Sequence, residues 1–190
     1  MTTSERRKAL IDLFYEYENC VNCPLGHTRK NFVFGTGNPD ASIVFVGEAP
    51  GKTEDEQGKP FIGRAGTVLS NLLSTIDLER EDVFILNVLK CRPPANRNPG
   101  TIEIEACRPI LNDQLKFIDP KVIICLGKVA ANTLLNVTDP MKDMISQVYE
   151  YLGIPVHIAY HPAATLYNSN LTEKLEDIFK SIKKSIDNGE

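Results

Sequence analysis

The chain has 190 residues, of which 42% are hydrophobic and 24% charged, and its formal net charge is −4. This composition is typical of a globular protein, and the length predicts a single domain over residues 1–190. The negative total gives no whole-chain sign of a nucleic-acid binder, although the segment from Lys90 to Arg97 carries three cations and no anion.

No stretch of the chain reaches the roughly 18 consecutive apolar residues of a membrane-spanning helix. The polar N-terminal segment also lacks the pattern of a signal peptide. We therefore expect a cytoplasmic protein in a reducing compartment, with no membrane partner. The five cysteines are then better suited to metal binding or catalysis than to disulfide formation.

Hydrophobic periodicity predicts strands that alternate with helices along the chain. An amphipathic helix capped by Ser4 is expected over residues 4–18, and an irregular segment over 28–40. Buried strands are predicted at 42–47, 83–88, 122–126 and 156–160. Further helices are predicted at 66–76, 101–117, 129–135 and 172–186, and residues 136–150 are ambiguous. The alternation predicts a three-layer α/β/α sandwich with a mostly parallel four-stranded sheet.

A long loop, GEAPGKTEDEQGKPFIGRAG from Gly47 to Gly66, follows the first predicted strand. Its five glycines allow the backbone to approach a ligand closely, and loops of this length in compact domains are usually functional or disordered. Ligands of open α/β sheets bind beyond the carboxyl ends of the strands, where this loop lies. The alternative interpretation is a solvated acidic loop.

Four cysteines lie beside turns or helix ends, whereas the fifth lies within a strand. Cys20 and Cys23 form a C-x2-C pair, and Cys91 and Cys107 are separated by 15 residues. This spread suits either structural zinc or an iron–sulfur cluster, and a cluster is favoured because it presents separate iron corners to single ligands. Four unrelated core cysteines remain the alternative. Cys125, in the segment VIICLG, is interpreted as a buried hydrophobic residue.

Six segments together resemble motifs of the family 4, thermostable-type uracil-DNA glycosylases of bacteria and archaea. In chain order they are CVNCPLG, GEAPGKTEDEQGKPFIGRAG, NVLKCRPPANRNP, ACRPIL, ICLG and YHPAA, and they run from residue 20 to 164. The resemblance implies the uracil-DNA glycosylase fold and a 4Fe-4S cluster on Cys20, Cys23, Cys91 and Cys107. It also implies an enzyme of base excision repair, which flips deoxyuridine out of DNA, hydrolyses its N-glycosidic bond and leaves an abasic site.

Three side chains suit the recognition of a flipped uracil. Phe61 is the only aromatic residue of the long loop and is expected to be a stacking platform in a closed pocket, the alternative being a core anchor for the loop. Asn87, at the end of the second strand, can donate to uracil O4 and accept from N3–H, a pattern that rejects cytosine. By resemblance, His161 donates to uracil O2 as negative charge develops on the departing base. All three are expected at one sheet edge together with Gly47–Glu48.

Two glutamates are candidates for the chemistry at the sugar. Glu48 and Glu54 could organise the attacking water and stabilise the cationic sugar, as carboxylates do in glycoside hydrolysis. By resemblance, the backbone of Glu48, Ala49 and Pro50 lies against uracil, and Glu54 lines the pocket, where it could also crowd the C5 methyl of thymine. The sequence leaves the role of Glu54 open. Nearby or similar residues are interpreted as solvated or structural: Asp55, Glu56, His27 and His157.

The segment after His161-Pro162 departs from the family pattern. Family members usually continue with arginines and a proline that meet DNA, whereas this chain has Leu166–Asn170. Leu166 can still wedge into the gap left by the flipped base, but a cation for the phosphates is missing. The departure predicts weaker binding to duplex DNA than in a typical member.

Uracil-containing DNA, single-stranded or duplex, is the expected partner of a monomeric protein. A sliding clamp is a possible further partner, although no motif for it is recognisable. The alternatives are a non-catalytic DNA-binding module, an iron–sulfur electron carrier, or a member that traps uracil. Trapping relatives carry a basic, histidine-containing insertion, which the loop RPPANRNPG lacks.

Overall fold

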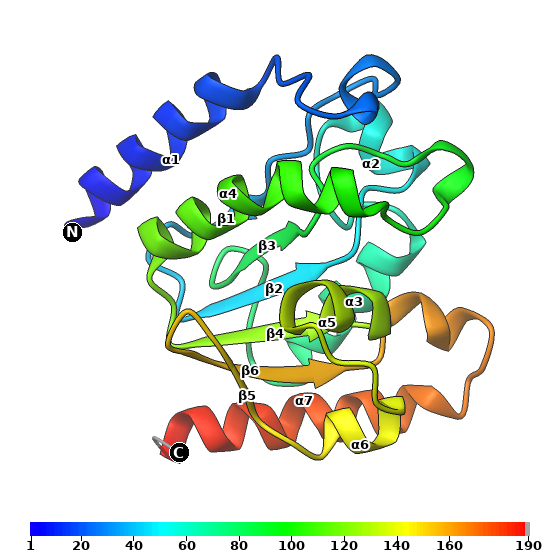
Figure 1. The fold of residues 1–190 in the computed structure, drawn as a ribbon. Helices are drawn as coiled ribbons and strands as arrows, with labels where there is room; N and C mark the ends of the chain where they lie inside the picture. The colour runs from blue at the N-terminus through cyan, green and yellow to red at the C-terminus, as the bar shows by residue number, and fades with distance from the viewer. Residues whose placement is uncertain (189–190) are drawn as a thin grey trace.

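The computed structural model describes residues 1–188, and a mixed sheet lies at its centre between two layers of helices (Figure 1). Within these residues the sheet has six strands in the order β1-β3-β2-β4-β6-β5. The four central strands are parallel: β2 (Ile43–Gly47), β3 (Phe84–Asn87), β4 (Val122–Leu126) and β6 (Ile154–Ala159). The outer strands β1 (Thr36–Gly37) and β5 (Tyr149–Tyr151) are antiparallel. The predicted α/β fold is confirmed, with two short edge strands added to the four expected.

The helices cover both faces of the sheet because its strands are buried on both sides. Along β2, Val44 and Val46 belong to one hydrophobic core, whereas Ile43 and Phe45 belong to the other. The first core is covered by α1 (Thr3–Tyr17), α4 (Thr101–Ile118), α5 (Lys128–Leu135) and α6 (Met141–Ile145). The second is covered by α3 (Arg64–Ser74) and α7 (Leu171–Asn188). This alternation along a strand is the expected period of two.

Some local predictions were wrong. The cap of α1 is Thr2 rather than Ser4: the Thr2 side chain accepts from the Glu5 N–H, and the Glu5 carboxylate accepts from the Thr2 N–H. Strand β1 lies in the segment expected to be irregular, and the long loop contains a short helix, α2 (Lys52–Gln57). The ambiguous segment contains α6 and the first two residues of β5. Within the part of the chain that the structure describes, three short 3-10 turns lie at Pro24–His27, Pro94–Asn96 and Pro162–Leu166.

The strand register brings the ends of the parallel strands to one edge. Gly47 of β2 pairs with Asn87 of β3, and Leu126 of β4 pairs with Ala159 of β6. The chain passes from β2 to β3 and then to β4 on the other side of β2, so the strand order reverses at β2. Such a reversal opens a crevice beyond the carboxyl ends of the strands. No helix within residues 1–188 is long and apolar enough to cross a membrane.

Candidate active site

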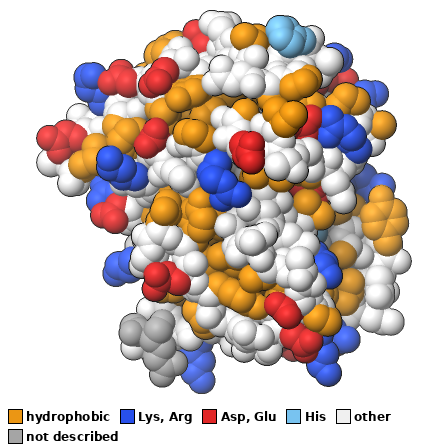
Figure 2. All heavy atoms as spheres, in the orientation of Figure 1, with side chains coloured by type: hydrophobic (Ala, Val, Ile, Leu, Met, Phe, Trp, Pro, Cys, Tyr) orange, Lys and Arg blue, Asp and Glu red, His pale blue; other side chains and the backbone are white. Residues whose placement is uncertain are grey.

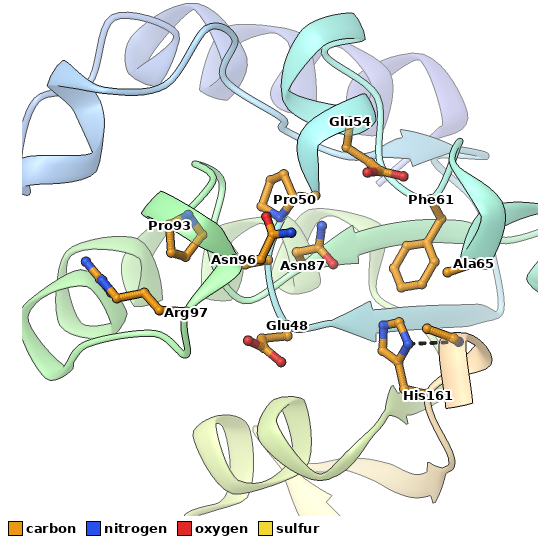
Figure 3. Close-up of a pocket in the computed structure, with 13 residues that line it drawn as sticks. Glu48, Pro50, Glu54, Phe61, Ala65, Asn87, Pro93, Asn96, Arg97 and His161 are labelled. Atoms are coloured by element: carbon orange, nitrogen blue, oxygen red, sulfur yellow. Dashed lines mark hydrogen bonds between the residues drawn. The ribbon is translucent and has the colours of Figure 1, made fainter. Parts of the chain in front are cut away.

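A cavity of about 330 Å³ lies at this sheet edge (Figure 3). All seven residues predicted to contact the base or the sugar line it: Glu48, Ala49, Pro50, Glu54, Phe61, Asn87 and His161. The sequence did not predict the other lining residues: Gly51, Ala65, Pro93, Asn96, Arg97 and Ala163. Three of these residues belong to the basic segment after β3: Pro93, Asn96 and Arg97. Because this segment directly follows the carboxyl end of a parallel strand, its position could have predicted that it lines the site.

Asn87 presents an unsatisfied acceptor to this cavity. Its side chain is only 2% exposed, and its Oδ1 is buried without a hydrogen-bond partner. A Cβ at Gly47 would lie 2.3 Å from this oxygen and 2.6 Å from the Phe61 ring, so only glycine fits at the end of β2. A buried acceptor without a partner costs free energy, and it is usually explained by a ligand or water that satisfies it.

Lys90 holds the backbone of Asn87 in place through a buried hydrogen bond. The Lys90 side chain is fully buried, and its Nζ donates to the Asn87 carbonyl at 2.7 Å. Burial lowers the pKa of this ammonium to about 7, an effect opposed by the nearby Cys107 and Cys91. Lys90 therefore connects the end of β3 to the segment that carries two of the predicted cluster ligands.

Phe61 stands in a strained backbone conformation. Its φ is 50°, in the left-handed region that costs a non-glycine residue roughly 1–2 kcal/mol. Phe61 is 6% exposed, and its ring stacks with the His161 imidazole, with ring centroids 5.6 Å apart and planes inclined by 27°. A Cβ at Gly66 would lie 1.8 Å from the Phe61 carbonyl oxygen. Position 66 must therefore be glycine for α3 to begin beneath this residue.

The Glu54 carboxylate organises the loop that carries Phe61. Its Oε1 accepts from the backbone N–H groups of Ile62 at 3.0 Å and Gly63 at 2.8 Å. In Figure 3 the carboxylates of Glu48 and Glu54 lie on opposite sides of the cavity. The surroundings of the two glutamates differ. Glu54 is hydrogen-bonded to the loop backbone, whereas burial raises the pKa of Glu48.

The interpretation of Asp55 as a solvated residue was wrong. Asp55 is only 4% exposed, and its Oδ1 accepts from the backbone N–H groups of Lys30 at 2.9 Å and Asn31 at 3.3 Å. Glu56, in contrast, is exposed as expected and pairs with Lys30. Asp55 thus ties the short helix α2 to the segment that precedes β1.

The hydrogen bonding of His161 determines where its imidazole carries a proton. The Ala163 N–H donates to His161 Nδ1 at 3.1 Å, so the proton of the neutral ring is on Nε2 (Figure 3, dashed line). Burial lowers the pKa of His161, and the opposing influence of Glu54 is smaller. His161, two residues beyond the end of β6, is therefore a neutral hydrogen-bond donor at neutral pH.

The four predicted cluster ligands come from three segments that approach one another. Cys23, Cys91 and Cys107 are buried, and Cys20 is partly buried. Desolvation is the main cause that raises the pKa of the Cys91 and Cys107 thiols, that of Cys107 to about 11. The nearby Cys23 makes a smaller contribution in the same direction. Arg29 donates to Cys91 Sγ at 3.1 Å and to the Cys20 carbonyl at 2.8 Å.

The donor chemistry of this cysteine group fits a metal cofactor held by thiolates. Four thiols and an arginine that donates to one sulfur provide soft ligands and a compensating charge. Within residues 1–188, however, no three cysteine, histidine or acidic side chains are gathered tightly enough for one metal ion. Cys125 is separate from this group: it lies fully buried in β4, where desolvation raises its pKa to about 12.

The family model of the Uracil DNA glycosylase superfamily matches residues 34–183, and these include the whole sheet and cavity. The chain therefore belongs to this superfamily. It is 47% identical over 183 residues to the type-4 uracil-DNA glycosylase of Archaeoglobus fulgidus, with 92% of each chain covered. It is 43% identical over 187 residues to that of Thermotoga maritima, with 92% of this chain and 94% of the relative covered. Within the superfamily, the chain is a member of the type-4 family, and the resemblance seen in the sequence is confirmed.

A more distant relative lies in another branch of the superfamily. The type-5 uracil-DNA glycosylase of Pyrobaculum aerophilum is 26% identical over 152 residues, which cover 70% of this chain and 66% of the relative. The higher identity and fuller coverage of the type-4 relatives place the chain with them.

Proposed function

We propose that this chain is a monofunctional uracil-DNA glycosylase that flips deoxyuridine from DNA and hydrolyses its N-glycosidic bond. The activity named for its type-4 relatives supports the proposal. The observation that carries it is the buried, unpartnered Oδ1 of Asn87 in a cavity beside an aromatic ring. None of the residues that line the cavity is a lysine that could form a Schiff base, and this supports hydrolysis by water.

Asn87 would read the Watson–Crick edge of uracil. Its Oδ1 accepts from uracil N3–H, and its amide nitrogen donates to O4. Cytosine offers an acceptor at N3 and a donor at N4, so it would leave both groups of the amide buried and unpaired. A site of this kind discriminates strongly between the two bases.

The ring pair limits where the base lies. Aromatic surfaces in contact stand about 3.5 Å apart, so the 5.6 Å between the Phe61 and His161 centroids leaves no room for a base between them. Uracil would therefore stack on the exposed part of the Phe61 ring and turn its edge towards His161. The backbone of Glu48, Ala49 and Pro50, which also lines the cavity, closes the site around the base.

His161 would stabilise the departing base. As the glycosidic bond breaks, negative charge develops on uracil O2, and a neutral imidazole that donates from Nε2 binds this charge mainly in the transition state. The hydrogen bond from the Ala163 N–H holds the ring in this tautomer.

Glu48 is the stronger candidate for the chemistry at the sugar. Its carboxylate can orient a water against C1′ and stabilise the cationic sugar. One carboxylate oxygen of Glu54 already accepts hydrogen bonds from the N–H groups of the loop. We therefore assign Glu54 the role of supporting this loop, in addition to its place in the cavity wall. The two carboxylates thereby divide the tasks that the sequence left open.

Charged side chains of both signs lie on the part of the surface that Figure 2 shows. On the face seen in Figure 2, basic and acidic side chains are interspersed, and no extended basic field is visible there. We propose that the protein acts as a monomer on uracil in DNA, in a reducing cytoplasm, with binding that depends on the extruded base more than on phosphate contacts.

We further propose that Cys20, Cys23, Cys91 and Cys107 hold a 4Fe-4S cluster. The cluster would clamp the segment after α1 against the loop and helix from Cys91 to Cys107, and so support Asn87 through the segment from Lys90 to Cys91. Iron and acid-labile sulfide should be present in equal amounts in the purified protein and absent from the Cys23→Ser variant. An unchanged melting temperature in the Cys23→Ser variant would contradict the structural role of the cluster.

A cleavage assay tests the activity. Matched oligonucleotides with uracil, thymine or cytosine at one site are incubated with the protein, and hot alkali then breaks any abasic site. Scission with uracil alone is the expected result. No scission by protein that retains iron would favour a binding module, and a protein–DNA adduct on a denaturing gel would favour a trapping member.

A further inference from the structure

Arg80 lies outside every motif of the sequence, yet it reaches the loop that carries Phe61. It belongs to the turn between α3 and β3, and its guanidinium is partly buried. Nη1 donates to the Phe61 carbonyl and Nη2 to the Pro60 carbonyl, each at 3.0 Å. The contact therefore joins two segments that are 19 residues apart in the chain.

The loop from Pro60 to Gly63 is held from two sides. Arg80 binds the carbonyls of its first two residues, and Glu54 accepts from the N–H groups of its last two. Between these contacts lies the left-handed backbone of Phe61. Such a conformation persists only where its surroundings over-determine it.

The chemistry of Arg80 is specific to a guanidinium. Two parallel N–H groups match two neighbouring carbonyls, whereas a lysine ammonium is a single point charge on a flexible stem. Among residues 1–188, the ion pairs do not include Arg80, so its donors serve the loop. Because the Arg80 guanidinium binds these two carbonyls and forms no ion pair with the described residues, we infer that its role is to hold the loop backbone in place.

We propose that Arg80 is a positioning residue of the glycosylase, which holds the Phe61 ring in place as the stacking platform for uracil. The proposal rests on the proposed function and adds a residue to it. Arg80 touches neither base nor sugar; it acts through the backbone of Phe61. Without the two hydrogen bonds, the left-handed residue relaxes and the ring leaves the position in which it meets the base.

The first test compares two arginines with the same kind of contact. Arg80→Met and Arg80→Lys are set beside Arg6→Met, because Arg6 also donates to two consecutive carbonyls, those of Phe117 and Ile118, away from the cavity. Single-turnover cleavage of a uracil oligonucleotide is measured below the melting temperature of every variant. We expect Arg80→Met and Arg80→Lys to be slower by about tenfold and Arg6→Met to cleave at the wild-type rate. A wild-type rate in Arg80→Met would overturn the proposal.

The second test asks whether Arg80 acts through Phe61. In a Phe61→Ala background the platform is already absent, so the further change Arg80→Met should cost less than about twofold. A full tenfold loss in that background would assign Arg80 a purely structural role and overturn the proposal. Wild-type protein that releases no uracil would instead overturn the proposed function itself.

Discussion

The two halves of the base site are built by different means. Asn87 is the last residue of a parallel strand and is placed by the sheet ladder and one buried lysine. Phe61 lies in a loop and is placed by two charged side chains: Arg80 donates to its carbonyl, and Glu54 accepts from the N–H of the next residue, Ile62. The half that reads the base is therefore part of the rigid core, whereas the half that stacks on it depends on contacts that single substitutions can remove.

Because of this difference, we expect one half of the site to determine which base is accepted and the other half to contribute stacking with any base. Discrimination between bases needs a fixed pattern of donors and acceptors, which a strand end provides. Stacking tolerates every base because each has a flat face, so a loop suffices for it. Substitutions in the strand-built half should accordingly have the larger effects and change selectivity, whereas those in the loop-built half should change rate alone.

The largest effect is expected from Asn87→Ala. Loss of the amide removes two hydrogen bonds to uracil, and kcat/KM for a uracil oligonucleotide should fall by about 10³. Steady-state cleavage measures this, with the exposed Asn71→Ala on α3 as the control that stays at the wild-type value. A loss of tenfold or less would show that Asn87 does not read the base.

A smaller loss is expected from Phe61→Ala. Stacking of a base on an aromatic ring is worth about 1–3 kcal/mol, so the cleavage rate should fall by about tenfold to a hundredfold, with the preference for uracil over cytosine unchanged. Phe61→Tyr keeps the ring and is the matched control. If Phe61→Ala also released cytosine, the division between reading and stacking would be wrong.

The pair Glu54→Gln and Glu54→Ala distinguishes a loop contact from a catalytic charge. A glutamine oxygen can still accept from the N–H groups of Ile62 and Gly63, so we expect Glu54→Gln to stay within about threefold of wild type and Glu54→Ala to lose about tenfold. Cleavage rates and melting temperatures decide between the two roles. Equal losses in both variants would make the charge, not the loop contact, the function of Glu54.

The buried imidazole should make stability depend on pH. The pKa of His161 is lowered from its ordinary 6.5 in the folded protein, so below pH 6.5 the unfolded chain binds the proton more readily than the folded one. Its contribution is fully present above pH 6.5 and is lost as the pH falls. Denaturant unfolding at several pH values should show a steeper decline for wild type than for His161→Phe. Parallel curves would contradict the assignment.

The smallest effect is expected on the rim of the site. Tyr167 follows the turn after His161 and is 88% exposed. Tyr167→Arg should tighten binding to duplex DNA severalfold at low salt, with the gain shrinking as salt rises, because a new phosphate contact releases counterions. Titration of labelled duplex at several salt concentrations measures this. Equal affinities throughout would show that this segment does not meet the phosphates.

The same division explains what the sequence could predict. The buried runs around Phe45 and Ile124 predicted the parallel strands. Asn87, which ends β3, and His161, which lies two residues beyond β6, were predicted to lie together because parallel strands end at one edge. Arg80 and Asp55 were missed because their roles depend on hydrogen bonds to backbone groups far along the chain. Neither hydrophobic periodicity nor a motif reports such contacts.

Short elements were missed for a different reason. A strand of two residues, such as Thr36–Gly37, is too short to show a period, and the three residues Tyr149–Tyr151 are little better. The cap of α1 was within reach, because Thr2 and Glu5 have the spacing of a capping box. Ser4 was the less suitable choice because it lies inside the first turn.

These short outer strands also bear on how the protein behaves when it is concentrated. A sheet edge exposes unpaired N–H and C=O groups to which another chain can add a strand, and that is how cross-β aggregates grow. With two residues in β1 and three in β5, each edge of this sheet offers only a brief template. The fold therefore protects the apolar central strands from recruitment into fibrils because the sheet ends in a very short strand on each side.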